Sequence, residues 1–162
     1  MPLIDGFESR LLVGIPAMDR SHREFVDLVN RMDRATDPSL AYLLPELLHH
    51  TRAHFATEEV LMRLSGYPQA EPHRVEHARV LAEMEHFSQR LGPGGLAVAR
   101  AYVRKQLPAW FERHALQMDG PLAEHLRSDR PVPGLRAPAI ASAQGAQSPA
   151  GEGLLTQELD IC

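Results

Sequence analysis

Histidines and carboxylates recur at helical spacing inside apolar stripes, and this pattern constrains the fold more than any other feature of the chain. His54 and Glu58 are four residues apart, as are His73 and His77, so each pair projects from one helix face with its side chains one turn apart. Both pairs lie on stripes that are otherwise apolar, which indicates a buried face. Buried imidazoles need strong partners, so we expect these faces to meet in one interior.

Four segments have the alternating three- and four-residue spacing of an amphipathic helix, the first starting near Asp19. Their stripes are Met18, His22, Phe25, Val29 and Met32; Leu44, Leu47, Thr51, His54, Glu58 and Leu61; His73, His77, Val80, Met84, Phe87 and Leu91; and Val103, Leu107, Trp110 and His114. The first three end at Asp37-Pro38-Ser39, Ser65-Gly66-Tyr67-Pro68 and Gly92-Pro93-Gly94-Gly95. With 44% apolar but only 6% aromatic residues, the chain is predicted to be all-α, an antiparallel up-down four-helix bundle.

Prolines divide the fourth segment, which runs from about Leu96 to Leu126. Pro108 and Pro121 lie inside it, and each removes a backbone donor and clashes with the preceding turn. We therefore expect this helix to kink, change register or be interrupted.

The two ends of the chain differ from the bundle. Residues 1–17 contain Gly6, Gly14 and Pro16 without a helical period, which predicts an extended arm packed across a domain of residues 1–130. In residues 131–151, Pro, Gly, Ala and Ser fill 15 of 21 positions, so 131–162 is interpreted as a flexible tail. Leu155 and Leu159 are one helical turn apart, which leaves two alternatives open. The end of the chain is either a small docking peptide for a protein partner or an unstructured terminus.

Charge and cysteine content exclude several classes of partner. The formal net charge is −4, from 17 basic and 21 acidic residues without a basic run, so we expect no nucleic-acid partner. Neither a signal peptide nor about 18 consecutive apolar residues is found, so we expect no membrane insertion. The one cysteine is Cys162; without disulfides, a cytoplasmic location is expected.

His22 and His114 complete a set in which all four helices send a nitrogen donor inward. A single histidine on an apolar stripe is more often a satisfied core residue than a ligand, but the whole set favours a metal. Asp119 follows His114 by five residues, about 140° around a regular helix. Asp119-Gly120-Pro121 also has the pattern of an N-cap before a helix-starting proline, so spacing alone leaves the role of Asp119 open.

Four motifs in the same order resemble the hemerythrin family, from Leu12 to about Arg127. They are Val13-Gly14-Ile15-Pro16-Ala17-Met18-Asp19-Arg20-Ser21-His22; His54-Phe55-Ala56-Thr57-Glu58-Glu59 with Gly66-Tyr67-Pro68; His73-Arg74-Val75-Glu76-His77; and Trp110-Phe111-Glu112-Arg113-His114 with Asp119. The resemblance implies two iron ions (Fe2+/Fe3+) with a hydroxo or oxo bridge. It implies one iron on His73, His77 and His114, the other on His22 and His54, and bridging by Glu58 and Asp119.

The chain departs from this family at three places outside the implied ligands. Phe7 stands where the family usually has Trp, Ser21 stands where it often has Gln, and a proline just past the aspartate, here Pro121, is rare in the family. These departures concern the packing of the arm and the geometry of the last helix. The histidines outside the set are expected to be solvated, although His49 and His50, one turn from His54, could instead support the ligands. They are His49, His50, His86 and His125.

The implied ligand count leaves one octahedral position open, on the iron with only His22 and His54. Two carboxylates supply less negative charge than the four glutamates of ferritin-like di-iron enzymes. We therefore expect reversible dioxygen binding, as carrier, store or sensor, and no enzyme activity. Four bulky residues beside the motif histidines are candidates for an oxygen pocket, although core packing explains them equally well. They are Phe25, Phe55, Trp110 and Phe111.

Two other hypotheses remain open from sequence. One is an oxygen- or redox-responsive signalling module that acts on a protein partner through the 131–162 tail. The other is a di-iron enzyme that handles nitric oxide or peroxide.

Overall fold

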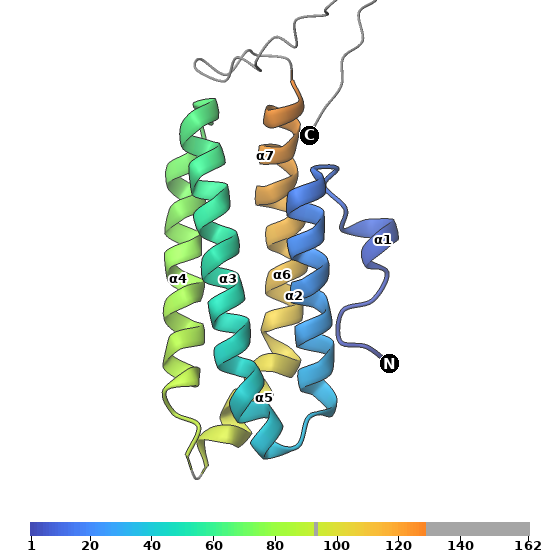
Figure 1. Ribbon diagram of the computed structural model, residues 1–162, viewed down its shortest axis with the longest axis vertical. Helices are drawn as coiled ribbons and strands as arrows, with labels where there is room; N and C mark the ends of the chain where they lie inside the picture. The colour runs from blue at the N-terminus through green and yellow to red at the C-terminus, as the bar shows by residue number, and fades with distance from the viewer. Residues whose placement is uncertain (93, 129–162) are drawn as a thin grey trace, which may run out of the picture.

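Four long helical segments run antiparallel, each beside the next, in a computed structural model that describes residues 1–92 and 94–128 (Figure 1). The segments are α2 (Pro16–Arg34), α3 (Asp37–Ser65), α4 (Ala70–Ser88) and a composite of α5 (Gly95–Lys105), α6 (Leu107–His114), the π-helix η1 (Ala115–Asp119) and α7 (Gly120–Arg127). The prediction of an all-α up-down bundle is confirmed. The 131–162 tail and the predicted boundary at residue 130 lie outside the described residues.

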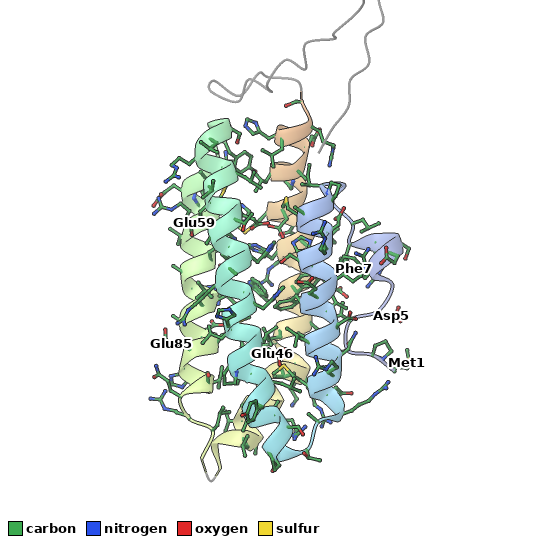
Figure 2. All side chains as sticks on the ribbon, in the orientation of Figure 1. Met1, Asp5, Phe7, Glu46, Glu59 and Glu85 are labelled. Atoms are coloured by element: carbon green, nitrogen blue, oxygen red, sulfur yellow. The ribbon has the colours of Figure 1, made fainter. Side chains whose placement is uncertain are left out.

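The N-terminal arm is not fully extended, because it contains one helical turn, α1 (Phe7–Arg10). Phe7 lies between α1 and α2 (Figure 2), with the guanidinium of Arg23 5.3 Å from its ring centroid. Asn30 of α2 accepts from the Ile4 amide at 3.0 Å and donates to the Ile4 carbonyl at 2.9 Å. The arm therefore packs on α2 through Phe7 and Ile4.

The first long helix begins at Pro16 and not near Asp19. Pro16 can open a helix because the first turn needs no intrahelical N–H donor there. The Asp19 carboxylate, which the sequence pattern placed at the helix start, accepts instead from the amides of Val13 (2.7 Å) and Gly14 (3.0 Å). It therefore holds the end of the arm against α2.

Helix α3 extends further toward its N-terminus than its stripe indicated. The side chain of Thr36 accepts from the Ser39 amide, and Pro38 sits in the first turn, so Asp37-Pro38-Ser39 starts this helix as well as closing the loop before it. Pro45 lies inside α3 on its exposed side. The helix ends where Gly66 takes the left-handed conformation (φ 64°) and the Tyr67 amide reaches back to the Met62 carbonyl.

The fourth segment is interrupted at both prolines, as predicted. Gln106 separates α5 from α6, and Pro108 sits in the first turn of α6. Before Pro121 the helix widens into the π-turn of η1, whose last bond runs from the Gly120 amide to the Ala115 carbonyl. A proline in a regular α-helix would clash with the carbonyl four residues earlier, and the changed register avoids this contact.

Two apolar clusters fill the bundle and leave a polar layer between them. The larger contains Phe25, Phe55, Val80, Trp110 and Phe111, together with residues of the arm and α5. The smaller contains Val13, Met18, Met62, Tyr67, Leu122 and Ala123. Along each of α2, α3 and the α6–α7 segment, buried histidine or carboxylate residues come between members of the two clusters.

Candidate metal centre

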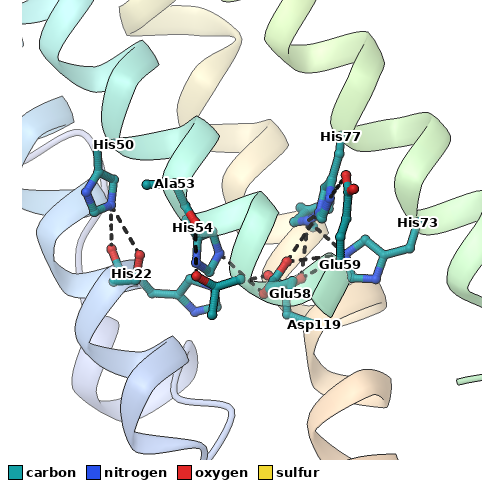
Figure 3. Close-up of polar contacts among 12 residues, drawn as sticks. His22, His50, Ala53, His54, Glu58, Glu59, His73, His77 and Asp119 are labelled. Carbon is teal, nitrogen blue, oxygen red and sulfur yellow. Dashed lines mark hydrogen bonds and ion pairs between the residues drawn. The ribbon is translucent and has the colours of Figure 1, made fainter. Parts of the chain in front are cut away.

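All seven residues predicted as metal ligands come together in the polar layer, and all four helical segments contribute (Figure 3). They are His22 from α2, His54 and Glu58 from α3, His73 and His77 from α4, and His114 and Asp119 from α6 and η1. Six are buried, and the side chain of His54 is 10% exposed. Their donor atoms form two overlapping groups, and both groups contain Glu58 and Asp119.

The larger group holds three histidines. The Nε2 atoms of His73 and His77 each lie 3.3 Å from Nε2 of His114. Because all three rings turn the same nitrogen inward, their lone pairs can converge on one point between α4 and α6.

The smaller group holds His22 and His54, whose ring centroids are 4.9 Å apart in an edge-to-face arrangement. His22 Nε2 lies 3.2 Å from Asp119 Oδ2, and His54 Nε2 lies 3.3 Å from Glu58 Oε1. This group therefore joins α2 and α3 to the same two carboxylates.

Each carboxylate divides its two oxygens between the two groups. Glu58 turns Oε1 to His54, and its Oε2 lies 3.2 Å from His77 Nε2. Asp119 turns Oδ2 to His22, and its Oδ1 lies 3.1 Å from His73 Nε2 and 3.2 Å from His114 Nε2. A carboxylate in this position can bridge two cations held by the two histidine groups.

Several polar atoms of the predicted metal ligands have no hydrogen-bond partner within the protein. All four carboxylate oxygens of Glu58 and Asp119 are buried without a hydrogen-bond donor, which is costly for groups of this polarity. Burial, and next the neighbouring His73, lowers the pKa of His77 to about 2; burial, and next His22, lowers the pKa of His54 to about 3. Neutral imidazoles and free carboxylate oxygens are the ligand forms that a divalent transition metal binds, so the residues fit a metal pair.

The two carboxyl groups have opposite pKa shifts. Burial, and next the charge of Asp119, raises the pKa of Glu58 well above its ordinary value. Burial alone would raise the pKa of Asp119, but the imidazoles of His114, His22 and His73 hold it well below its ordinary value. The surroundings therefore favour the protonated form of Glu58 and the ionised form of Asp119.

The π-turn explains how Asp119 reaches the site. Five residues after His114, it would point away on a regular α-helix, but η1 adds a residue to this turn and returns Asp119 to the inner face. Asp119 makes no side-chain capping bond to α7, so the N-cap alternative is wrong. Single π-turns of this kind often occur at functional sites.

Aromatic rings pack directly on the donor imidazoles. Phe55 stacks on His77 with 3.6 Å between centroids, Trp110 stacks on His114 at 5.0 Å, and Phe111 meets His22 edge-on at 5.5 Å. Phe25 stacks on Phe111 at 4.7 Å. All four residues predicted for an oxygen pocket therefore lie on one side of the donor set, in the larger apolar cluster.

Two histidines expected to be solvated are half-buried. His50 of α3 reaches α2, where its Nε2 lies 3.0 Å from the Ser21 carbonyl oxygen. His125 Nε2 lies 3.1 Å from the Ser65 carbonyl oxygen. The solvated interpretation is wrong for these two because each makes an interhelical contact, whereas His49 and His86 are exposed.

A pocket that the sequence did not indicate reaches the donor set from the surface. It has a volume of about 260 Å³, lies between α2 and α3, and is lined at its inner end by His54 and Glu58. No periodic pattern in the sequence marks it, because small or half-exposed side chains line its outer part.

Comparison with known proteins agrees with the geometry of the centre. The family model of the hemerythrin HHE cation binding domain matches residues 13–126. The chain belongs to the hemerythrin family. It is 34% identical over 119 residues to a bacteriohemerythrin of Ralstonia nicotianae, covering 74% of this chain and 85% of that protein. A bacteriohemerythrin of Stenotrophomonas maltophilia is 24% identical over 75% of this chain and 81% of its own length. The myohemerythrin of Sipunculus nudus is 33% identical over 49% of this chain and 64% of its own.

Membership of the hemerythrin family establishes the cofactor and the general function. Hemerythrins bind a di-iron centre, and this chain has the His, Glu and Asp cluster to hold it. The chain is a non-haem iron protein that binds oxygen, in a family of oxygen-binding proteins rather than enzymes. None of the helices within residues 1–92 and 94–128 is long and apolar enough to cross a membrane.

Proposed function

We propose that this chain binds dioxygen reversibly, as a carrier or store. In this proposal His73, His77 and His114 hold one iron, His22 and His54 hold the other, and Glu58 and Asp119 bridge the two. The orientation of the two carboxylates carries the proposal. In Glu58 and in Asp119, one oxygen faces the three-histidine group and the other faces the two-histidine group.

The bound iron pair supplies two electrons and one open coordination position for dioxygen. The unequal number of histidines in the two groups decides on which side this open position lies. Three imidazoles surround one side of the bridging carboxylates and only two surround the other, so the second side keeps room for a small ligand. His54 is also the donor residue with the greatest exposure to solvent.

The surrounding side chains favour binding over substrate oxidation. Phe55, Trp110 and Phe111 cover the imidazoles and exclude water from one side of the site. Only two buried carboxylates lie among the donors, which limits the negative charge available to stabilise highly oxidised iron. These side chains therefore favour holding dioxygen over oxidising a substrate.

Stopped-flow mixing of the diferrous protein with dioxygen tests the proposal. A coloured adduct with one dioxygen per two irons is expected, with complete recovery after removal of oxygen and a second cycle. One irreversible oxidation, or steady oxygen consumption with added reductant, would overturn reversible binding in favour of an enzyme.

A further inference from the structure

The pocket between α2 and α3 connects the solvent with one end of the donor set. On the α2 side it is lined by Ala17, Met18, Ser21 and Glu24, and on the α3 side by His50, Ala53 and Thr57, with His54 and Glu58 at its inner end. Ala17, Glu24, Ala53 and Thr57 are exposed, whereas Met18 and Glu58 are buried. The pocket therefore runs from the surface to the carboxylate layer, and Figure 3 shows Ala53 and His50 on the same helix as His54.

The inner end of the pocket faces the two-histidine group. His54 belongs only to this group, and Glu58 Oε1, the oxygen nearest His54, is turned the same way. A second groove reaches His114 between α4 and η1, but it leads to the three-histidine group. Dioxygen that must reach the two-histidine side therefore has its direct path between α2 and α3.

The charge of the lining suits a neutral molecule. The α2–α3 pocket carries the carboxylate of Glu24 at its outer end and has neither lysine nor arginine among its lining residues, all of which the structure describes. The groove at His114, in contrast, is lined by Arg79 and Arg113. A negative rim repels small anions through Coulomb interaction while leaving dioxygen unaffected.

We propose that the α2–α3 pocket is the entrance for dioxygen, and that small side chains at Ala17, Ala53 and Thr57 keep it open while Glu24 disfavours anions. This inference rests on the proposed function, since it names the path to the same site. His50 holds the outer end of the pocket in place, because its ring bridges from α3 to the Ser21 carbonyl of α2.

The entrance is tested first in the metal-free full-length protein, where iron chemistry plays no part. Dissolved dioxygen is paramagnetic and speeds the relaxation of nearby amide protons. The largest enhancement is expected at the amides around Ala17, Ser21 and Ala53, and Ala53→Leu should remove it. Ala56→Leu, on an exposed position of the same helix outside this pocket, is the matched control and should leave it unchanged.

The iron-loaded protein gives a second, kinetic readout. Ala53→Leu, or Ala17→Leu if the first variant folds poorly, should slow dioxygen association about tenfold, as a modest added barrier would, with iron content unchanged. Glu24→Lys should speed the association of azide with the diferric protein and leave dioxygen association unchanged.

The results of these experiments distinguish a failure of the proposed entrance from a failure of the proposed function. A maximum of relaxation enhancement at the groove lined by Arg79 and Arg113 would overturn the entrance, as would equal slowing by Ala53→Leu and Ala56→Leu. Enhancement at the α2–α3 pocket with irreversible oxidation of the iron-loaded protein would support the entrance and contradict the proposed function.

Discussion

Trp110 donates its indole N–H to Glu76 Oε1 at 2.8 Å while its ring stacks on His114. The stack covers the three-histidine group, and the hydrogen bond fixes the orientation of the indole. Hydrogen bonds from Arg79 and Trp110 lower the pKa of Glu76 to about 2, against the effect of burial. Glu76 is therefore ionised at neutral pH and accepts a strong, charge-assisted hydrogen bond from the indole N–H.

Replacing Trp110 should shorten the lifetime of the oxygenated protein without removing iron. Trp110→Ala opens the aromatic layer to water, and Trp110→Phe keeps a stacked ring but loses the bond to Glu76. We expect conversion to the diferric form to be fastest in the alanine variant and intermediate in the phenylalanine variant. Absorbance decay in air measures the rate, and elemental analysis measures the iron. Loss of iron from Trp110→Ala would mean that Trp110 holds the ligands in place and does not merely exclude water.

Removing one bridging carboxylate should lower the iron content. Glu58→Gln keeps the size of the side chain but removes the charge that faces both histidine groups, so fewer than two irons per chain, or much weaker binding, is expected. Glu59→Gln is the matched control, because Glu59 is the next residue in the chain and is half-exposed. Its Oε1 lies 3.9 Å from His77 Nδ1, and Glu59 is in neither donor group. Elemental analysis after dialysis measures both, and equal loading of the two variants would contradict the bridging role of Glu58.

The histidine positions could be predicted from the sequence because three- and four-residue spacing translates directly into one helix face. His54 with Glu58 and His73 with His77 required only this rule. Asp119 did not follow from it, because its inward orientation depends on the π-turn, and spacing on a regular helix gives the opposite direction. Only the resemblance to a family placed it among the ligands.

Interhelical contacts at the surface could not be predicted in the same way. His50 and His125 have no pattern that separates them from solvated histidines, since each bonds to a backbone carbonyl on another helix. The α2–α3 pocket also depends on how two helices pack, and Ala53 and Thr57 line it without any periodic signal. The start of α2 was predicted near Asp19, whereas the helix begins at Pro16 and Asp19 binds the end of the arm.

Replacing Pro45 should stabilise the fold. Pro45 lies in the interior of α3 on its exposed side, where it lacks a backbone donor, and an interior proline costs about 3 kcal/mol relative to alanine. Pro45→Ala should therefore raise the melting temperature, less than the full cost because the unfolded chain gains freedom. Pro38→Ala, in the first turn of the same helix, should give no increase. Circular dichroism melts compare the two, and a lower melting temperature for Pro45→Ala would show that α3 needs the proline at this point.

Deleting residues 131–162 should leave iron content, helicity and oxygen binding unchanged. These residues contain none of the predicted ligands, and their composition is poor in core-forming side chains. Elemental analysis, circular dichroism and oxygen titration of the shortened chain test this. A large fall in melting temperature would indicate that the segment containing Leu155 and Leu159 docks on the bundle, and the signalling hypothesis would gain support.

The stability of the metal-free protein should fall as the pH falls below about 6.5, the ordinary pKa of histidine. Folding lowers the pKa of His54 to about 3 and of His77 to about 2. Below pH 6.5 the unfolded chain binds protons at these two positions that the folded protein does not, so stability falls as the pH falls.

Glu58 acts in the opposite direction. Its pKa is raised in the folded protein, so the folded state keeps a proton that the unfolded state loses above its ordinary pKa of about 4.3, and stability falls as the pH rises. At pH 5 the two histidines outweigh the one glutamate, so the melting temperature should fall from pH 6.5 to pH 5, though by less than the histidines alone would give.

Glu58→Gln separates the two effects, because the amide does not titrate. In this variant the fall from pH 6.5 to pH 5 should be steeper than in the unmodified chain. Thermal melts of chelator-treated protein at half-unit pH steps measure the slope in both proteins. Equal slopes would show that Glu58 does not oppose the histidines, and stability that increases from pH 6.5 to pH 5 would contradict the neutral, buried state of His54 and His77.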